Sequence, residues 1–298
     1  MSQHEEPTHA TTGPTATSSR LPATLRLGAV HLTVTDLDRS IAFYEDAIGL
    51  RLHRREDSLA VMGTGEEDLL VLYEEPSSRR AGRHAGLYHY ALLFPSREEL
   101  AHAALRLAET KTPIQGASDH GTHEAIYLPD PDGNGIELAA DRPRELWPRP
   151  LEYTGGPHPL DLDGLLAAIA GEERHGKAGP GLVIGHVHLH VGDLERGLAF
   201  YRDVLGFELM TFMVGAAAFV SAGGYHHHLG FNIWRGEGLP PVPEGRLGLR
   251  KWTVMLDYPE EVEAVRERVR AAGIEVEDEG QGFLVRDPWD IAMVFTPN

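Results

Sequence analysis

The first regular apolar pattern in the chain is an alternation of polar and apolar residues over Ala29–Thr35, which predicts a half-buried strand. The apolar spacing of the following Arg39–Ile48 predicts an amphipathic helix. Short apolar runs then predict strands near Arg51–Arg55, Leu59–Met62 and Leu69–Tyr73. The order strand, helix, strand, strand, strand defines a βαβββ module.

The same opening occurs a second time in the chain. The run from His31 to Arg39 returns between His188 and Arg196, 157 positions later, and Ala-Phe-Tyr-x-Asp-x-x-Gly follows at the same offset in both copies. A strand over Gly185–Gly192 and a helix over Arg196–Leu205 are therefore expected in this second copy. Internal repetition of this kind indicates a modular architecture.

Each copy is followed by a module of a second kind. The first of these has an expected strand Leu87–Phe94, helix Ser96–Thr110 and strands Ala125–Leu128 and Gly135–Ala140. The other has strand Trp252–Leu256, helix Pro259–Ala272 and strands Phe283–Val285 and Ile291–Phe295. The chain is thus predicted to be an α+β protein with four βαβββ modules in two domains.

The boundaries of those domains follow from changes in composition. Residues 1–24 are small and polar and predict a disordered tail, and 25–141 form the N-terminal domain. Dense prolines begin a linker over 142–181 with one short helix, Leu162–Ala170, and 182–298 form the C-terminal domain.

Composition excludes several classes of function. The 27 basic and 45 acidic residues give a net charge of −18, which disfavours binding to nucleic acid or to a membrane surface. The absence of cysteine excludes thiolate metal sites and cysteine nucleophiles. Because the sequence has neither a signal peptide pattern nor an apolar run of roughly 18 residues, we expect a cytoplasmic protein.

The chain nevertheless holds 17 histidines, and several occupy strands. Alternation places His186, His188 and His190 on one face of a strand, and His31 on the corresponding face of the first module. Glu137 lies between two apolar residues in the last strand of the second module. A polar strand face of this kind needs water or a ligand to contact it.

These motifs resemble those of a known superfamily. The Asp-Leu-x-Arg opening, the Asp-Pro-Asp-Gly-Asn-Gly-Ile-Glu run ending at Glu137, and the module order are similar to the vicinal oxygen chelate (glyoxalase/bleomycin-resistance/extradiol dioxygenase) superfamily. Within it, the two-domain layout and the run Gly224–Asn232 look most like extradiol catechol 2,3-dioxygenases. The resemblance covers about residues 27–141 and 182–297.

The resemblance implies a metal held by two histidines and one carboxylate, with Fe(II) expected and Mn(II) compatible with the same ligands. Module four has Trp252 where a histidine would fall, and its last strand has no carboxylate. If modules one and two pair, the ligands are His31, His89 and Glu137. If modules two and three pair, they are His188, His89 and Glu137. The second set is favoured because module two carries His120 and Tyr127 and module three carries His226–His228, both similar to an extradiol site, whereas the matching strand of module one has no histidine.

The same two modules provide the expected catalytic residues. The resemblance implies that His227 is the general base and that Tyr127 and His120 hydrogen-bond the substrate. Alternation along a strand, however, would place His227 on the face of Leu229 and Phe231. Either that strand is bulged, or the base is the histidine before or after it, His226 or His228.

The expected function is therefore Fe(II)-dependent extradiol cleavage of a catechol by dioxygen. An isomerase of the same fold is an alternative, although it needs a second carboxylate or glutamine where His226–His228 stand. A metal-free protein that binds an aromatic ligand is another. A homo-oligomer is compatible with the sequence.

Overall fold

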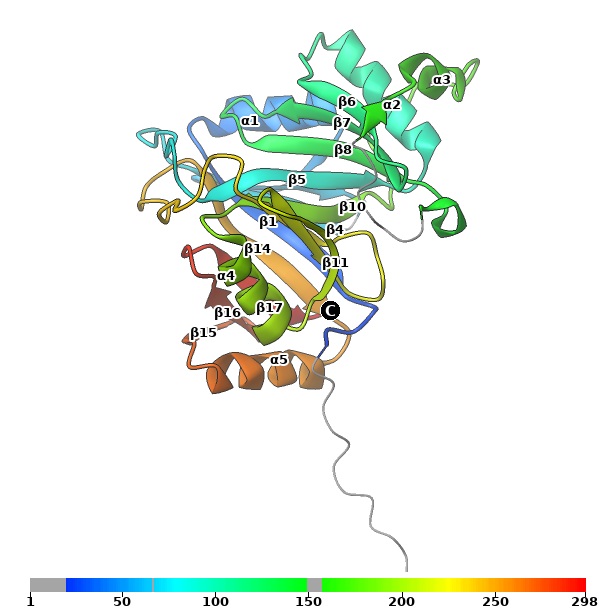
Figure 1. The fold of residues 1–298 in the computed structure, drawn as a ribbon. Coiled ribbons are helices and arrows are strands. Elements are labelled where there is room, and N and C mark those ends of the chain that lie inside the picture. The colour runs from blue at the N-terminus through cyan, green and yellow to red at the C-terminus, as the bar shows by residue number, and fades with distance from the viewer. Residues whose placement is uncertain (1–19, 66, 149–156) are drawn as a thin grey trace, which may run out of the picture.

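A computed structural model describes residues 20–65, 67–148 and 157–298 (Figure 1). Most of the predicted tail, residues 1–19, lies outside these ranges. The end of the predicted tail is ordered, however, because Leu21 is buried and its backbone N–H donates to Gly206 O over 2.9 Å. The globular part of the chain therefore begins before residue 25.

The predicted order of elements is confirmed in all four modules. Modules one and three begin with a long strand, then a short α-helix that continues as a π-helix. In module one these are β1 Arg26–Val34, α1 Leu37–Phe43, the π-helix Tyr44–Ile48, β2 Arg51–Glu56, β3 Leu59–Thr64 and β4 Glu67–Glu74. In module three they are β10 Val183–His190, α4 Leu194–Leu198, the π-helix Ala199–Val204, β11 Glu208–Met213, β12 Ala217–Ser221 and β13 Leu229–Asn232.

Modules two and four have a longer α-helix without the π-helical turn. Module two consists of β5 Gly86–Phe94, α2 Arg97–Glu109, β6 Gly116–Asp119, β7 His123–Pro129 and β8 Gly135–Asp141. Module four consists of β14 Gly248–Leu256, α5 Pro259–Ala271, β15 Val276–Glu279, β16 Gly282–Arg286 and β17 Ala292–Pro297. The described part of the linker contains a 3₁₀ turn Arg144–Leu146, β9 His158–Pro159 and α3 Leu162–Ala167, which ends three residues before the predicted Ala170.

The repeated Asp-Leu-x-Arg and Phe-Tyr motifs have structural roles. Asp36 accepts a hydrogen bond from the backbone N–H of Arg39 over 2.9 Å, and so caps the N-terminus of α1. Tyr44 is fully buried, and its hydroxyl donates to Asp130 Oδ2 in module two over 3.1 Å. In the same way Tyr201 of module three donates to Asp287 of module four over 2.6 Å. Each tyrosine thus links two consecutive modules through a buried hydrogen bond.

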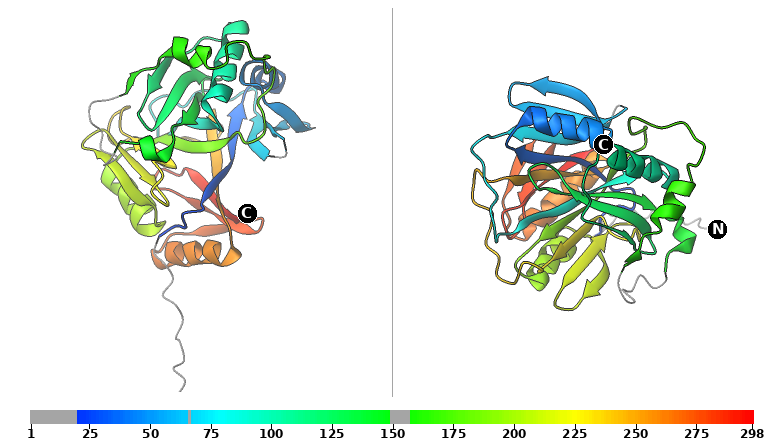
Figure 2. Two further views of the ribbon diagram at one scale, coloured as in Figure 1. Left: turned by 90° about the vertical axis from the view of Figure 1, so that its right-hand side faces the viewer. Right: turned by 90° about the horizontal axis from the view of Figure 1, so that it is seen from above.

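Strand pairing, in contrast, joins modules from different halves of the chain. Strand β5 pairs antiparallel with β10, which joins modules two and three, here called the inner pair. Strand β1 pairs antiparallel with β14, which joins modules one and four, the outer pair. In Figures 1 and 2 the long N-terminal strand accordingly runs beside the C-terminal strands. The expected domains 25–141 and 182–298 are therefore not separate sheets, since each half of the chain contributes to both pairs.

Candidate metal centre

Strand register in the inner pair brings four side chains into one row. His186 of β10 lies opposite Ala91 of β5, Ala91 lies beside Glu137 of β8, and Glu137 lies opposite Tyr127 of β7. Residues directly opposite one another on paired strands point to the same face. Because the methyl group of Ala91 is small, the longer side chains on either side of it converge over this position. His89 lies one pleat further along β5 on the same face.

Three of these side chains meet at one point. His89 Nε2 lies 3.1 Å and His186 Nε2 lies 3.2 Å from the same Glu137 oxygen, Oε2. The two imidazole nitrogens are 3.2 Å apart, and all three side chains are buried. Two imidazoles and one carboxylate are a ligand set suited to a divalent iron or manganese ion.

The electrostatics of this point also favour a cation. Burial raises the pKa of Glu137, but the adjacent His186 and hydrogen bonds from the surrounding imidazoles outweigh it, so that the pKa lies well below the usual range. Within the described residues, Glu137 Oε1 receives no well-aligned hydrogen bond, although His123 Nε2 lies 3.0 Å away. A buried carboxylate that is ionised and incompletely satisfied is a natural ligand for a metal ion.

The structure does not bring His188 to this point. The Nε2 atom of His188 instead contacts the side-chain amide of Asn232 over 2.9 Å, and its ring packs 5.0 Å from that of His89. The sequence repeat aligns His188 with His31, but the position that reaches Glu137 is one pleat earlier, at His186. The sequence does contain a feature that marks His186, namely its distance from the following helix. His89 and His186 each lie seven residues before a helix N-cap, at Ser96 and Asp193 respectively.

Among the residues that the structure describes, the outer pair has no equivalent set of ligands. His31 bonds to the hydroxyl of Tyr73 over 3.0 Å, and burial together with Lys251 lowers its pKa to about 4. The register places Lys251, not Trp252, opposite His31, and Trp252 is fully buried in the core. Ala29 stands where the inner pair has His186. The structure therefore does not bring His31 together with His89 and Glu137, as the first predicted set required.

His120 and Tyr127 lie beside the candidate metal centre, as expected. Their side chains share a hydrogen bond of 2.7 Å, and the Tyr127 ring lies 5.7 Å from that of His89. Burial lowers the pKa of His120 to about 4 and raises that of Tyr127 well above its usual value. A neutral histidine and a protonated tyrosine can therefore offer both an acceptor and a donor to a bound molecule.

The three consecutive histidines precede strand β13, which begins only at Leu229. The conflict between His227 and the strand alternation therefore does not arise, because no strand includes the histidine run. The ring of His227 lies 4.2 Å from that of His186, whereas His226 turns to Asp141 and His228 to Ser221. Of the three, His227 packs most closely against the candidate metal centre.

Two aromatic side chains, Tyr88 and Trp234, lie beside the same site, and the sequence analysis does not predict them. Tyr88 and Trp234 are partly exposed, and their rings lie 5.3 Å apart. The Tyr88 ring also packs against the rings of His89, His188 and His190 at 4.8, 5.1 and 4.9 Å. This places a surface suited to a flat aromatic molecule next to the three candidate ligands.

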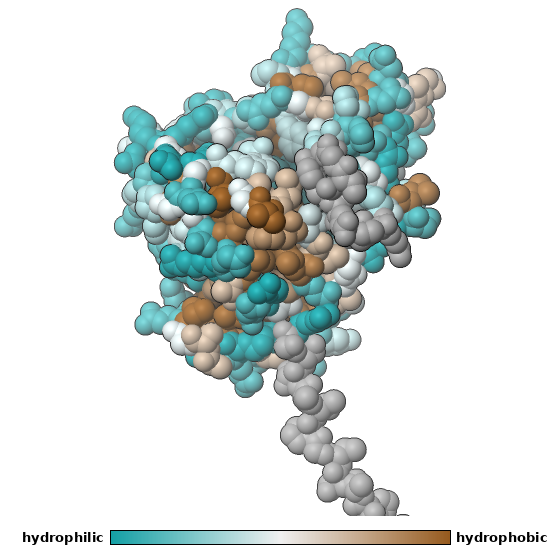
Figure 3. All heavy atoms as spheres, in the orientation of Figure 1, coloured by the Kyte–Doolittle hydropathy of each residue, from teal (hydrophilic) through white to brown (hydrophobic). Residues whose placement is uncertain are grey.

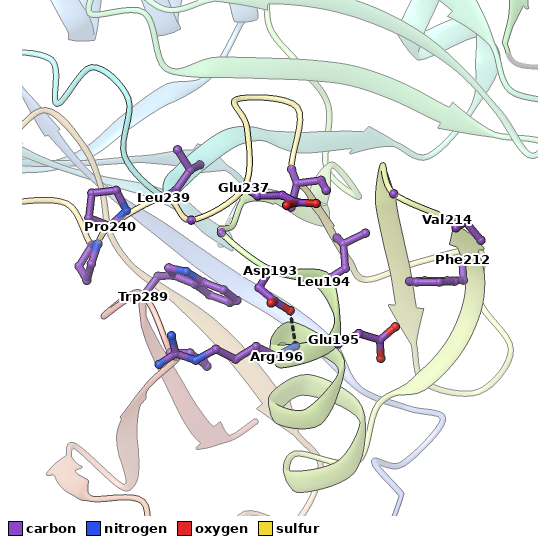
Figure 4. A pocket seen from close by; sticks show the side chains of 16 residues that line it. Asp193, Leu194, Glu195, Arg196, Phe212, Val214, Glu237, Leu239, Pro240 and Trp289 are labelled. Atoms are coloured by element: carbon purple, nitrogen blue, oxygen red, sulfur yellow. Dashed lines mark hydrogen bonds between the residues drawn. The ribbon is translucent and has the colours of Figure 1, made fainter.

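A separate pocket of about 890 Å³ lies between the start of α4, the β11–β12 hairpin and Trp289. Figure 4 shows Leu239 and Trp289 at the left of this pocket and Phe212 and Val214 at the right, with Asp193 between them. No histidine is among its lining residues. In the orientation of Figure 1, apolar residues gather near the middle of the molecular surface (Figure 3). This pocket is not part of the candidate metal centre.

None of the helices in the described ranges is long and apolar enough to cross a membrane.

Comparisons with known proteins match both halves of the chain to one superfamily. Residues 26–138 and 183–295 match the model of the Glyoxalase/Bleomycin resistance protein/Dioxygenase superfamily. The chain is 45% identical to a catechol-2,3-dioxygenase of Bacillus subtilis over 268 residues, which cover 88% of this chain and 93% of the relative.

Solved structures share the fold at low sequence identity. A putative dioxygenase from Bacillus subtilis has a TM-score of 0.61 at 12% identity, with 91% of this chain and 85% of that chain covered. Glyoxalase I from Zea mays has a TM-score of 0.58 at 19% identity, with 92% of each chain covered.

Proposed function

Because the chain belongs to the Glyoxalase/Bleomycin resistance protein/Dioxygenase superfamily, we propose that it is an extradiol dioxygenase that cleaves a catechol with dioxygen. The 45% identity to a catechol-2,3-dioxygenase over most of both chains supports this activity. The observation that carries the proposal is the convergence of His89, His186 and Glu137 on one buried point. Such a reaction belongs to the breakdown of aromatic compounds.

In this proposal the three side chains hold a divalent metal, with Fe(II) expected and Mn(II) as the alternative. Bound there, the ion would supply coordination of both catechol oxygens and of dioxygen at its open positions. The set replaces the predicted one by exchanging His188 for His186. Imidazole and carboxylate ligands must be unprotonated, which agrees with the neutral His186 and ionised Glu137 that their lowered pKa values indicate.

The remaining residues of the site would act on the substrate. His227, whose ring packs on that of His186, would accept the second catechol proton. Tyr127 would hydrogen-bond a substrate oxygen with support from His120, because a Tyr127 hydroxyl that accepts from His120 Nε2 keeps its own proton to donate. Tyr88 and Trp234 would pack against the aromatic ring.

Metal content and ring cleavage test this proposal together. The protein is loaded with Fe(II) without air, its iron is measured, and then catechol and air are added while the yellow ring-cleavage product is followed. His186→Ala should lose the iron and the activity, since it removes one of three ligands. His188→Ala, the matched control one pleat away, should retain the iron.

Two outcomes would contradict the proposal. If His188→Ala loses the iron and His186→Ala keeps it, the ligand set is wrong. If a zinc-loaded sample free of iron is fully active, the reaction is not oxidative, because zinc has no redox chemistry.

A further inference from the structure

A chain of hydrogen-bonded side chains runs from the candidate base to the edge of the inner pair. His227 Nδ1 lies 2.9 Å from His226 Nδ1, and His226 Nε2 lies 3.0 Å from Asp141 Oδ1. Asp141 is the last residue of β8 in module two, whereas both histidines precede β13 in module three. The chain therefore forms only because these two modules pair.

Neighbouring rings fix the orientation of His226 within this chain. Its ring lies 4.1 Å from Tyr225 and is stacked 4.7 Å from His123. Trp147, from the start of the linker, packs edge-on at 5.2 Å. His226 is buried, so water does not compete for its two nitrogen atoms.

The ionisation state of each group is set by its surroundings. Burial lowers the pKa of His226 to about 3, so this imidazole is neutral near pH 7. Burial raises the pKa of Asp141, but the hydrogen bond from His226 outweighs it and lowers the pKa overall, so this carboxylate is ionised. A neutral imidazole carries one proton, and an ionised carboxylate can only accept.

These states leave one arrangement of protons along the chain. His226 must donate from Nε2 to Asp141, which leaves His226 Nδ1 as an acceptor. His227 must then donate from Nδ1, and its own Nε2 is left with a lone pair. The order of donors is thus set by the carboxylate at the far end.

We infer that Asp141 and His226 are positioning residues that hold His227 in the Nδ1-protonated tautomer, so that its Nε2 is free to take the catechol proton. This inference rests on the proposed dioxygenase function and assigns that function two residues beyond the reacting groups. A carboxylate that fixes the tautomer of a catalytic histidine has a large effect on turnover in hydrolases. The same physical effect is expected here through one intervening imidazole.

A second metal ion bound by some of the same residues is the alternative, and the test must distinguish it from the positioning role. Ligand-type atoms of His123, Asp141 and His226 lie within 4.8 Å of one another. This arrangement would also suit a second metal ion. A metal on His226 Nε2 would displace the proton that this atom gives to Asp141. The tautomer chain and a second metal site therefore exclude each other.

The test compares the wild type with Asp141→Asn, Asp141→Glu and a control, His228→Asn. An amide at position 141 can accept from His226 or, after a flip, donate to it, so it no longer fixes the order of donors. Glutamate keeps the carboxylate. His228 adjoins His227 in sequence but bonds to Ser221 over 3.0 Å instead of Asp141.

The first readout is the tautomer itself, from ¹⁵N NMR of histidine-labelled, zinc-loaded full-length protein, with His227 assigned from the signals lost in His227→Phe. The wild type, Asp141→Glu and His228→Asn should show protonated Nδ1, and Asp141→Asn should show a mixture. The second readout is turnover of the iron-loaded enzyme. Asp141→Asn should lower kcat by about 10-fold or more, within the ~10²–10⁴-fold that a general base contributes, while iron content and KM stay unchanged. Asp141→Glu should recover most of kcat.

Each other outcome overturns the inference. Protonated Nε2 on His227 in the wild type contradicts the proton order, whether or not the enzyme is active. A changed tautomer with unchanged kcat contradicts the positioning role. Zinc binding that falls from two ions to one in Asp141→Asn identifies a metal ligand instead. If the iron-loaded wild type does not cleave catechol, the proposed function fails, which is seen without any variant, and the base role fails with it.

Discussion

Glu137 is a buried, ionised carboxylate that several histidines of the inner pair contact. It is almost fully buried, yet its pKa lies well below the usual range because the histidines around it stabilise the charged form despite burial. Three imidazoles approach its two oxygens within 3.0 to 3.2 Å. Without a cation, the stability of this arrangement depends on neutral hydrogen bonds alone, which compensate a buried charge only in part.

We therefore expect metal to stabilise the folded protein through Glu137. Free metal at 100 times its dissociation constant adds about 2.7 kcal/mol to the free energy of unfolding. For a chain of this size that raises Tm by about 5 °C. Thermal unfolding with Mn(II), compared with unfolding in a chelator, should show this rise in the wild type and in His188→Ala. Glu137→Gln should show none, and an equal rise in that variant would exclude Glu137 as a ligand.

The residues of the site were only partly predictable from sequence. His89, Glu137, His120, Tyr127 and His227 were identified, and the structure gathers all of them, although their chemical roles stay predictions. The sequence analysis does not find His186, because the repeat compares modules one and three, whereas the spacing to the helix N-cap that matches His186 with His89 compares modules two and three.

At the scale of elements, the two tyrosine-to-aspartate contacts hold consecutive modules together. Asp287 accepts from Tyr201 and from the backbone N–H groups of Trp289 and Ile291, both over 2.8 Å. These hydrogen bonds lower the pKa of Asp287, but burial outweighs them and raises it to about 6. The carboxylate is therefore ionised at neutral pH at a cost to folding.

The pH dependence of stability should show this cost. Because the folded protein holds the Asp287 proton more tightly than the unfolded chain, this group stabilises the fold fully below about pH 4, and that contribution is lost as the pH rises to about 6. The two-unit shift corresponds to roughly 3 kcal/mol at most. Asp287→Asn keeps the shape and can donate to Tyr201 without a charge. Its Tm relative to the wild type should therefore be higher at pH 7.5 than at pH 5.

A matched control is Asp203→Asn. Asp203 is exposed, and its ion pair with Arg202 lowers its pKa, so its replacement should not favour the variant at the higher pH. If the difference between Asp287→Asn and the wild type is the same at both pH values, the raised pKa of Asp287 is wrong.

The elements themselves were well predicted. The order βαβββ is confirmed in each module because alternation and helical spacing are local properties of the sequence. The exception is the histidine run, where a strand was assumed to begin before Leu229. In the structure His228 and His226 bond through their side chains to Ser221 and Asp141, contacts with distant residues that no local pattern encodes.

At the scale of the whole molecule, the sequence left open which modules pair. All four modules present a similar apolar helix-facing surface and a long first strand, so local pattern does not distinguish their partners. The registers of β5 with β10 and of β1 with β14 answer the question. The pairing also explains why one set of ligands forms: His89 and Glu137 belong to one half of the chain and His186 to the other.

An engineered disulfide can test this pairing in solution, because the chain contains no cysteine of its own. Leu93 of β5 and Val183 of β10 are directly opposed, a separation at which a disulfide bridges antiparallel strands. Leu93→Cys with Val183→Cys should form an intramolecular disulfide on oxidation, detected as a mobility shift that a reductant reverses. Closing a loop of this length should add about 4 kcal/mol to the free energy of unfolding. The control joins Leu93→Cys with Met255→Cys, whose partner is Arg26 of β1, and it should stay reduced. Rapid oxidation of the control with a reduced test pair would mean that modules two and three are not paired, and the metal centre they form could not exist as described.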